Sequence, residues 1–375
     1  MSDLDKHLDI EEDFFSIDKK SHRKLRKELS AKDRSKYKKT DRDKQAPNQD
    51  VLDKFSKEGY FTGRVISIIA DSILVEDPNG EVVCHIKGSL KQEKTEKKNL
   101  VAVGDIVIFE KTTPSTGVIV HIKPRYSILS RADNLRRNKE QIIAVNIDIL
   151  FIVCSAVMPG LKPSLIDRYI IAARQGNMHP IIVINKIDLL KQKPEIIDEP
   201  NYQKQLEIYA EFSRVYSKLD IPIIEISCTT GEGLDNLRAA MEKKTSVFSG
   251  QSGVGKTSLI NKILGTNLKT AEIVAKTYKG SHTTTTATLI PLDHESFCID
   301  TPGIRSFGIW QITQQDLDQY FKEFLAYKHL CKYQNCAHLQ EPNCGVKEAV
   351  EEGLISPLRY QSYSDLKLIP DDIWR

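Results

Sequence analysis

Several groups of residues have the types and spacing needed for chemistry, and the first is the run Val247 to Asn261. It reads VFSGQSGVGKTSLIN and contains the Gly-x4-Gly-Lys-Thr pattern of a phosphate-binding loop. Lys256 would neutralise the β- and γ-phosphates and Thr257 would ligate magnesium. The alternative is an ordinary Gly/Ser turn between a strand and a helix. The residues expected to contact a nucleotide are Gly250, Gln251, Ser252, Gly253, Val254, Gly255, Lys256, Thr257 and Ser258.

The second group combines three cysteines with one histidine near the C-terminus. Cys331, Cys336, His338 and Cys344 follow the pattern C-x4-C-x-H-x5-C. Three thiolates and an imidazole form a complete tetrahedral set for zinc, with no position left open for a substrate. We therefore expect one structural Zn²⁺ that stabilises a segment too small to bury a large core. The alternative is a set of free, buried cysteines.

A third motif, Asn185-Lys186-Ile187-Asp188, follows the apolar run His179 to Ile184. The Asp188 carboxylate would accept hydrogen bonds from N1–H and N2–H₂ of guanine, a pair of donors that adenine lacks. Asn185 would support the loop and approach N7, and the Lys186 stem would cover the ring. As an isolated tetrapeptide the motif would more readily be a surface turn. Its combination with a phosphate loop favours a guanine site at the carboxyl end of a parallel strand.

Further expected contacts follow other strands. After the strand Pro222 to Ser227, a backbone amide near Ser227 and Cys228 would donate to guanine O6, although an ordinary strand-to-helix turn is the alternative. The run Phe297 to Gly303 ends in Asp-Thr-Pro-Gly, in which Asp300 would hold magnesium through water and the Gly303 amide would meet the γ-phosphate. In the run Thr283 to Thr286, Thr284 is the expected magnesium ligand, and a Thr-rich edge strand is the alternative.

These motifs need a parallel α/β sheet to position them. Residues 147–153 form a nearly continuous apolar run, as expected for a strand buried on both faces. We expect helices over Ser164 to Gln175, with Ser164 as N-cap and Gly176 as the stop, over Tyr202 to Leu219, and over Asp235 to Lys243. Residues 123–139 are expected to be a linker.

Residues 59–128 have a different pattern, with short β-type runs separated by turn residues. We expect five strands, at Phe61 to Ile69, Ser72 to Glu76, Val82 to Ile86, Asp105 to Glu110 and Gly117 to Ile122. Five strands in such a short stretch predict an OB-fold barrel, a fold that often binds RNA or single-stranded nucleic acid. The lysine-rich insertion at residues 87–99 would be a loop facing phosphates; a purely structural barrel is the alternative.

Charge is distributed unevenly along the chain. The net charge is +3, but residues 1–18 contain seven acids against Lys6, and residues 19–44 contain thirteen Lys/Arg against four acids. The basic block predicts either a disordered tail with a polyanionic partner or a solvated tail without one. With 28% charged residues, no apolar run near the ~18 residues of a membrane span and an acidic start, we expect a cytoplasmic protein without membrane contact.

The order of the motifs is that of a circularly permuted GTPase: NKID and SCTTG precede GQSGVGKT, HTTTT and DTPG. Permutation is tolerable because domain termini tend to lie close together at the surface. A permuted GTPase between a small barrel and a Cys₃His segment closely resembles the RsgA/YjeQ family of bacterial GTPases that depend on the small ribosomal subunit. The resemblance covers about residues 58–370. We expect a charged extension over residues 1–57, an OB-fold RNA-binding domain over 58–128, a permuted α/β P-loop GTPase domain over 129–310 and a mainly helical zinc-binding domain over 311–375.

The resemblance implies a function in late maturation of the 30S subunit. The implied partners are GTP and GDP with Mg²⁺, the 30S subunit and its 16S rRNA, and we expect a monomer. Ile304 stands where Ras-like GTPases place the glutamine that orients water, so intrinsic hydrolysis should be slow. His282, where the family pattern also has histidine, is the candidate to orient that water; the alternative is that it contacts RNA.

Two other functions stay open at this point. One is an RNA-binding scaffold whose guanine nucleotide is structural or barely hydrolysed, and turnover would distinguish it. The other is an ATP-dependent kinase or ATPase, which Asp188 disfavours.

Overall fold

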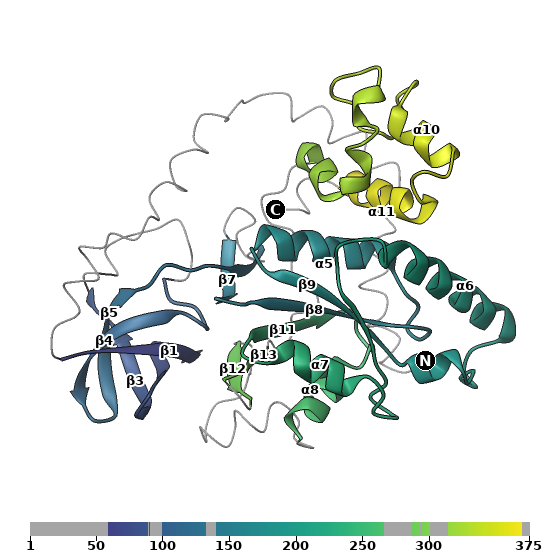
Figure 1. Cartoon of the computed structure of the whole chain (residues 1–375). Helices are drawn as coiled ribbons and strands as arrows, with labels where there is room; N and C mark the ends of the chain where they lie inside the picture. Colours follow the sequence, from purple (N-terminus) through teal and green to yellow (C-terminus); the bar gives the residue numbers. More distant parts are fainter. Residues whose placement is uncertain are drawn as a thin grey trace, which may run out of the picture. The chain divides into compact units, whose positions relative to one another are not determined.

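The structure is a computed structural model that describes residues 59–88, 90, 100–132, 140–265, 287–292, 295–300 and 314–369 (Figure 1). The charged N-terminal extension and residues 91–99 of the lysine-rich insertion lie outside this part of the chain. No helix within the described residues is both long and apolar enough to span a membrane.

The first described element is a closed barrel of five strands. Strand β1 pairs antiparallel with both β2 and β4, and β3 pairs parallel with β5, so the strands form one ring. The inward side chains, among them Val65, Val75, Phe109 and Ile119, are almost completely buried. The predicted five-stranded barrel is confirmed. Its strands are β1 (Tyr60–Ile69), β2 (Ser72–Asp77), β3 (Gly80–Ile86), β4 (Ile106–Thr113) and β5 (Thr116–Ile122).

The central part is an α/β layer in which β10, β9, β8, β11 and β13 run parallel and β12 is antiparallel beside β13. Strand β8 is buried along its whole length, and its residues alternate between two cores: Leu150 and Ile152 on one face, Phe151 and Val153 on the other. Helices α5 and α6 cover the first face and α7 and α8 the second (Figure 1). The strands are β8 (Ile149–Ser155), β9 (His179–Asn185), β10 (Ile223–Glu225), β11 (Thr245–Gly250), β12 (Thr288–Pro291) and β13 (Phe297–Asp300); the helices are α5 (Pro163–Gln175), η3 (Ile187–Leu190), α6 (Glu199–Tyr216), α7 (Leu234–Met241) and α8 (Lys256–Leu264).

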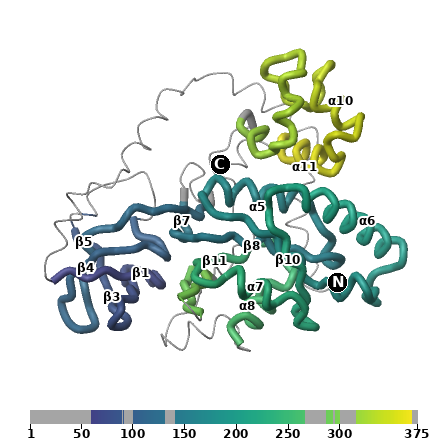
Figure 2. Tube along the Cα trace, in the orientation of Figure 1, coloured from purple at the N-terminus to yellow at the C-terminus, as the bar shows by residue number. Residues whose placement is uncertain are grey.

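The chain enters this layer through the strands that carry the NKID motif and reaches the phosphate loop later. Figure 2 shows this order by colour, from α5 and α6 in teal to α7 and α8 toward green. Strand β11, which leads into the phosphate loop, lies between β8 and β13. The two halves of the predicted site therefore end at one edge of the same sheet, as expected for parallel strands.

The barrel and the α/β layer share contacts at β1. Ser67 of β1 pairs with Thr288 of β12. Arg64 donates hydrogen bonds to Thr245 Oγ1 at 2.7 Å and to the Asn146 backbone oxygen at 3.2 Å, and its guanidinium lies 4.6 Å from the Phe297 ring centre. Thr245 begins β11 and Phe297 begins β13, so Arg64 contacts the strands leading to the phosphate loop and to Asp300.

The C-terminal part consists of short helices around an aromatic core. Phe321, Phe324 and Tyr363 are fully buried, and their rings meet at centroid distances of 4.8–5.4 Å. A buried ion pair between Arg359 of α11 and Asp167 of α5 joins this part to the α/β layer. The elements are η4 (Gln314–Tyr320), η5 (Lys322–Phe324), η6 (Lys328–Leu330), α10 (Gly345–Glu351) and α11 (Pro357–Leu368).

The expected linker at residues 123–139 is wrong in part, because it contains a strand. Strand β6 (Ile128–Ala132) pairs antiparallel with β7 (Glu140–Val145). The hairpin is supported by the buried Ser127 hydroxyl, which donates to the Ile147 backbone oxygen at 2.6 Å. Such a short strand depends on tertiary partners, which the local pattern does not show.

All three predicted helices differ from the structure by a few residues at one end or both, and two of the starts have a clear cause. Helix α5 begins at Pro163, with Lys162 at the N-cap, so Ser164 is not the cap. Proline suits the first helical position because its missing N–H would have no partner there. Helix α6 begins at Glu199 rather than Tyr202, because the Asp198 side chain caps it by accepting from the Asn201 N–H at 2.9 Å.

Candidate nucleotide site and candidate metal centre

The phosphate loop joins β11 to α8, and three glycines give it its shape. Gly250, Gly253 and Gly255 have φ values of 148°, 78° and 93°, a region that residues with a Cβ rarely adopt. At Gly250 a Cβ would also lie 1.9 Å from the Val153 backbone oxygen. The glycines predicted from the motif are thus required by the backbone itself.

The side chains of the loop lie where an anion would be bound. Lys256 Nζ donates to the backbone oxygens of Gly250 and Gln251, both at 2.6 Å. Thr257 and Ser258 are exposed in the first turn of α8, whose backbone N–H groups favour a negative charge. Ser252 and Gly253 are also exposed, whereas Val254 is buried in the core beneath α7 and α8. The loop therefore has the cation, the N–H groups and the hydroxyls that a nucleotide phosphate needs.

Asn185 joins the NKID loop to two other loops. It is 1% exposed at the end of β9, and its Nδ2 donates to the Val254 backbone oxygen at 2.8 Å. Its Oδ1 accepts from the N–H of Lys186 at 2.8 Å and from that of Cys228 at 3.2 Å. One buried amide thus fixes the NKID loop, the phosphate loop and the SCTTG segment relative to one another.

The side chain of Lys186 also connects the NKID loop to the phosphate loop. Its backbone is left-handed, with φ 63°, and Nζ donates at 2.7 Å both to the Met158 backbone oxygen and to that of Gly253. Burial lowers the pKa of Lys186, and the charge of Asp188 opposes this shift. Met158 was not predicted. The only available signal was its place just beyond the buried strand β8.

Asp188 and Ser227 are joined by a hydrogen bond between their side chains. The Ser227 hydroxyl donates to Asp188 Oδ1 at 2.6 Å and accepts from the N–H groups of Thr229 and Thr230 at 3.2 and 3.1 Å. This bond fixes the orientation of the carboxylate, and both of its oxygens keep lone pairs for further donors. Cys228 is half-buried, and burial raises the pKa of its thiol, so the thiol stays neutral.

The remaining predicted residues lie at the end of β13 or outside the described part of the chain. Asp300 ends β13, next to β11, and only its backbone position is described. His282, Thr284 and Gly303 lie outside the described residues.

The Cys₃His set comes together as one compact cluster. The four candidate ligand atoms of Cys331, Cys336, His338 and Cys344 lie within 4.8 Å of one another. His338 Nδ1 is 3.3 Å from Cys344 Sγ and 3.5 Å from Cys331 Sγ, and those two sulfurs are 3.8 Å apart. Tetrahedral zinc with ordinary bond lengths would separate two sulfurs by about 3.8 Å and sulfur from nitrogen by about 3.5 Å. The cluster therefore fits a tetrahedral cation.

The thiols of this cluster need a cation to become thiolates. Burial, with the neighbouring Cys344 thiol, raises the pKa of Cys336 to about 12. Burial also raises the pKa of Cys344. All seven cysteines are free thiols, so no disulfide competes for the cluster.

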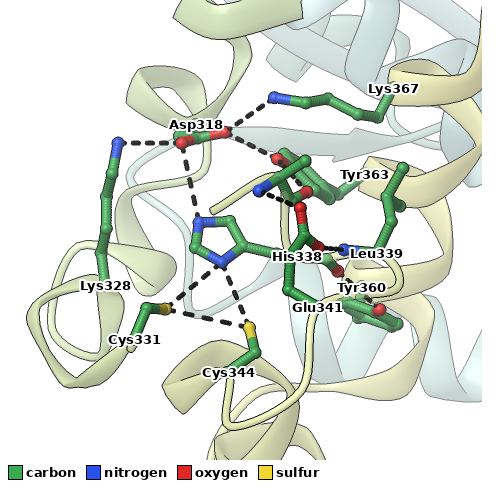
Figure 3. A network of polar contacts seen from close by, with 11 residues as sticks. Asp318, Lys328, Cys331, His338, Leu339, Glu341, Cys344, Tyr360, Tyr363 and Lys367 are labelled. Carbon is green, nitrogen blue, oxygen red and sulfur yellow. Dashed lines mark hydrogen bonds and ion pairs between the residues drawn. The ribbon is translucent and has the colours of Figure 1, made fainter. Parts of the chain in front are cut away.

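A polar network surrounds the cluster and holds the histidine loop (Figure 3). The Glu341 carboxylate accepts from the N–H groups of Ala337, Leu339 and Gln340 at 2.9–3.1 Å. Tyr360 of α11 donates to the His338 backbone oxygen at 2.7 Å. The sequence pattern identified the ligands but not these supports, because they come from other turns and from α11.

Asp318 is the charged centre of this network. It is 3% exposed, and burial alone would raise its pKa. The nearby His338 imidazole and the hydrogen bonds from Lys328 and Tyr363 outweigh that effect and hold its pKa well below the usual range. Asp318 is therefore a buried carboxylate that stays ionised.

The sequence and the structure both resemble known proteins. Residues 122–310 match the family described as RsgA GTPase. A small ribosomal subunit biogenesis GTPase RsgA from Chlorobaculum parvum is 39% identical over 313 residues, which cover 81% of this chain and 96% of that protein. The protein of the same name from Actinobacillus succinogenes is 39% identical over 298 residues, which cover 78% of this chain and 79% of the relative.

Two solved structures have similar folds. YjeQ from Thermotoga maritima has a TM-score of 0.63 and 31% identity, and the match covers 82% of this chain and 97% of that one. YloQ, described as a circularly permuted GTPase, has a TM-score of 0.61 and 25% identity, with 84% of this chain and 96% of that one covered. The circular permutation predicted from the sequence thus agrees with the description of a solved structure that has a similar fold.

Proposed function

Because the chain belongs to the RsgA GTPase family, we propose that it hydrolyses GTP in the biogenesis of the small ribosomal subunit. The observation that carries the proposal is the set of hydrogen bonds made by Asn185. They connect the loop that would read guanine with the loop that would hold the phosphates. A site built from both loops selects a guanine nucleotide rather than any phosphate.

Each part of GTP has a proposed contact. Asp188 accepts hydrogen bonds from guanine N1–H and N2–H₂, and a backbone N–H near Cys228 donates to O6. The stem of Lys186 covers the ring, consistent with its extension from the NKID loop to Gly253. The N–H groups of the phosphate loop and Lys256 surround the β- and γ-phosphates. Mg²⁺, when bound with GTP, would neutralise phosphate charge, and Thr257, Thr284 and, through water, Asp300 would hold it.

In hydrolysis the oxygen of a water molecule bonds to the γ-phosphorus, and the bond between the γ-phosphorus and the oxygen that bridges it to the β-phosphate breaks. The products are GDP and phosphate, and the proton of the water ends on phosphate. Lys256 and the Gly303 N–H would stabilise the charge that develops. Ile304 cannot orient water, so we propose that His282 does so when the ribosomal subunit is bound. An unchanged stimulated kcat in His282→Ala would remove that role.

The proposed partner is the 30S subunit, contacted through its 16S rRNA. The barrel and the Cys₃His segment would grip the RNA in the GTP state, and hydrolysis would release the grip. The Cys₃His cluster would hold one structural Zn²⁺ and take no part in the chemistry. We propose that the protein acts as a cytoplasmic monomer.

The decisive experiment measures hydrolysis of GTP and ATP with and without purified 30S subunits. We expect 30S subunits to accelerate GTP turnover, with little ATP turnover in either case. Lys256→Ala controls for contaminating hydrolases, because it removes the cation from the phosphate loop while leaving the sheet intact. The proposal fails if 30S subunits neither accelerate GTP turnover nor bind more tightly with a non-hydrolysable analogue. Nucleotide-dependent binding without turnover would instead identify an RNA-binding scaffold.

A further inference from the structure

The two ring nitrogens of His338 face different groups. Nδ1 faces the sulfurs of Cys331 and Cys344, at 3.5 and 3.3 Å. Nε2 is completely buried and lies 3.6 Å from Asp318 Oδ2, with no closer polar partner among the described residues. Figure 3 shows the ring between the two sulfurs and the carboxylate.

Asp318 is itself fixed by three donors from other elements. Tyr363 of α11 donates to Oδ1 at 2.6 Å, and Lys367 of the same helix lies 3.3 Å from that oxygen. Lys328 of η6 donates to Oδ2 at 2.8 Å. The carboxylate therefore has little freedom to move away from the imidazole.

A neutral imidazole carries one proton, and the nitrogen without it has the lone pair that binds a cation. A carboxylate beside one nitrogen favours the proton there and leaves the other nitrogen as the ligand. We propose that Asp318 is a positioning residue for the metal centre. Its carboxylate accepts the Nε2–H of His338, and this directs the Nδ1 lone pair of the ring at the cation. Asp318 does not touch the cation in this arrangement.

This role differs from a purely structural one. Asp318 also joins η4 and η6 to α11, so its loss could loosen the fold without any specific effect on the histidine. A structural role predicts that other members of the network matter equally for metal binding. A positioning role predicts that only the group facing Nε2 does.

Metal affinity measured on the full-length protein separates the two roles. The probe is Zn²⁺ in competition with a chromogenic chelator, and Co²⁺ absorption reports the ligand geometry. We expect Asp318→Asn to weaken Zn²⁺ binding by about 10–100-fold, the range found for groups that orient metal ligands. Lys328→Gln removes the other donor to Oδ2, and Tyr363→Phe removes the shortest hydrogen bond to Oδ1. Both controls should bind Zn²⁺ within about threefold of the unchanged protein.

Wild-type affinity in Asp318→Asn would overturn the proposal, and so would an equal loss in Lys328→Gln. Because Asp318→Asn could fail to fold, a second measurement uses the unchanged protein. With ¹⁵N-labelled histidine and bound Zn²⁺, we expect one ring whose Nδ1 is metal-bound and whose Nε2 carries a proton. Coordination through Nε2 would show that Asp318 does not set the orientation of the ring.

Discussion

The side-chain amide of Asn185 donates a 2.8 Å hydrogen bond to the backbone oxygen of Val254, across 69 positions of the sequence. Asn185 ends β9 in the NKID loop, and Val254 lies in the phosphate loop that follows β11. The bond is buried and therefore strong relative to one exposed to water. It makes two motifs, which are in permuted order along the chain, parts of one site.

Gly255→Ala tests how closely these two loops must approach. Gly255 has φ 93°, and a Cβ there would lie 2.5 Å from Asn185 Nδ2. We expect GTP affinity to fall by about tenfold or more, because backbone strain of about 1–3 kcal/mol adds to the displaced amide. Binding of a fluorescent GTP analogue measures it.

Gly265→Ala is the matched control for this substitution. Gly265 also has a left-handed backbone, with φ 63°, but a Cβ there meets no atom within 4 Å. It ends α8, away from the loop. The control should lose some stability and keep its GTP affinity. Equal affinity in both variants would mean that the approach of Gly255 to Asn185 is not required for binding.

Asp188→Asn tests the reading of the base. The substitution keeps the shape of the side chain but replaces an acceptor with a donor opposite the guanine N–H groups. We expect the preference for GTP over ATP to fall by about 10²-fold or more. Competition binding with the two nucleotides measures it. Asp198→Asn is a suitable control, because asparagine also caps a helix well and the Asp198 side chain makes its hydrogen bonds to Asn201 at the start of α6. An unaltered preference in Asp188→Asn would favour an ATP-binding protein.

Much of the site could be predicted because its residues are fixed by local chemistry. The phosphate loop needs glycine where φ is positive, and the structure shows this at Gly250, Gly253 and Gly255. The buried strand β8 was recognisable because it is apolar on both faces. The Cys₃His spacing identified a compact cluster because all four residues lie in one short segment.

What could not be predicted depends on contacts between distant segments. The backbone oxygen of Met158 accepts a hydrogen bond from Lys186, 28 positions later in the sequence. Asp167 forms its ion pair with Arg359, 192 positions later. Neither contact has a local pattern. The hairpin of β6 and β7 was missed for the same reason, because its stability comes from Ser127 and from packing. The roles of all the nucleotide-site residues stay predictions, and those of His282, Thr284 and Gly303 fall on residues outside the described part of the chain.

Arg359→Met tests the attachment of the C-terminal part to the α/β layer. Arg359 is 5% exposed and Asp167 is 2% exposed. Asp167 also accepts from the Tyr216 and Ser362 hydroxyls, and Arg359 Nε donates to Glu323 at 2.5 Å. Removing the cation leaves a buried carboxylate whose charge is balanced only by the two hydroxyls, so we expect a loss of about 3–5 kcal/mol in the free energy of unfolding. Urea denaturation measures it.

A double variant shows whether the loss comes from the uncompensated charge. Asp167→Asn combined with Arg359→Met removes both charges and should be more stable than Arg359→Met alone. Arg214→Met is the exposed control, because its ion pair with Glu211 lies at the surface and should contribute less than about 1 kcal/mol. Equal losses at Arg359 and Arg214 would show that burial of the pair does not matter.

Asp77 should make the stability of the barrel depend on pH. Burial alone would raise its pKa, but Lys111 at 2.7 Å and the N–H groups of Asn79 and Gly80 outweigh this and lower it. A lowered folded-state pKa contributes stability above the unfolded value of about 3.9, and that contribution is lost as pH falls through the folded value.

The pH test compares the unchanged protein with Asp77→Asn. We expect the variant to be less stable by about 1–2 kcal/mol at pH 7, and the difference to shrink below pH about 3.9. Urea denaturation across this range measures it, with the exposed Asp71→Asn as control. A difference that stays constant down to pH 3 would mean that the charge of Asp77 is not what stabilises the barrel.

Removal of the metal should affect the C-terminal part and spare the nucleotide site. Cys336→Ser should reduce bound zinc from about one per chain to near zero and lower the Tm, because a structural zinc contributes directly to folding. Cys154→Ala is the control, since Cys154 is a buried thiol of β8 outside the cluster and should leave the zinc content unchanged. Elemental analysis measures zinc, and GTP affinity, measured with Mg²⁺ present, should stay within about threefold because Asp188 and Lys256 lie on other elements. Full zinc content in Cys336→Ser would show that the cluster is not the metal site, and a large loss of GTP affinity would show that the two sites are coupled.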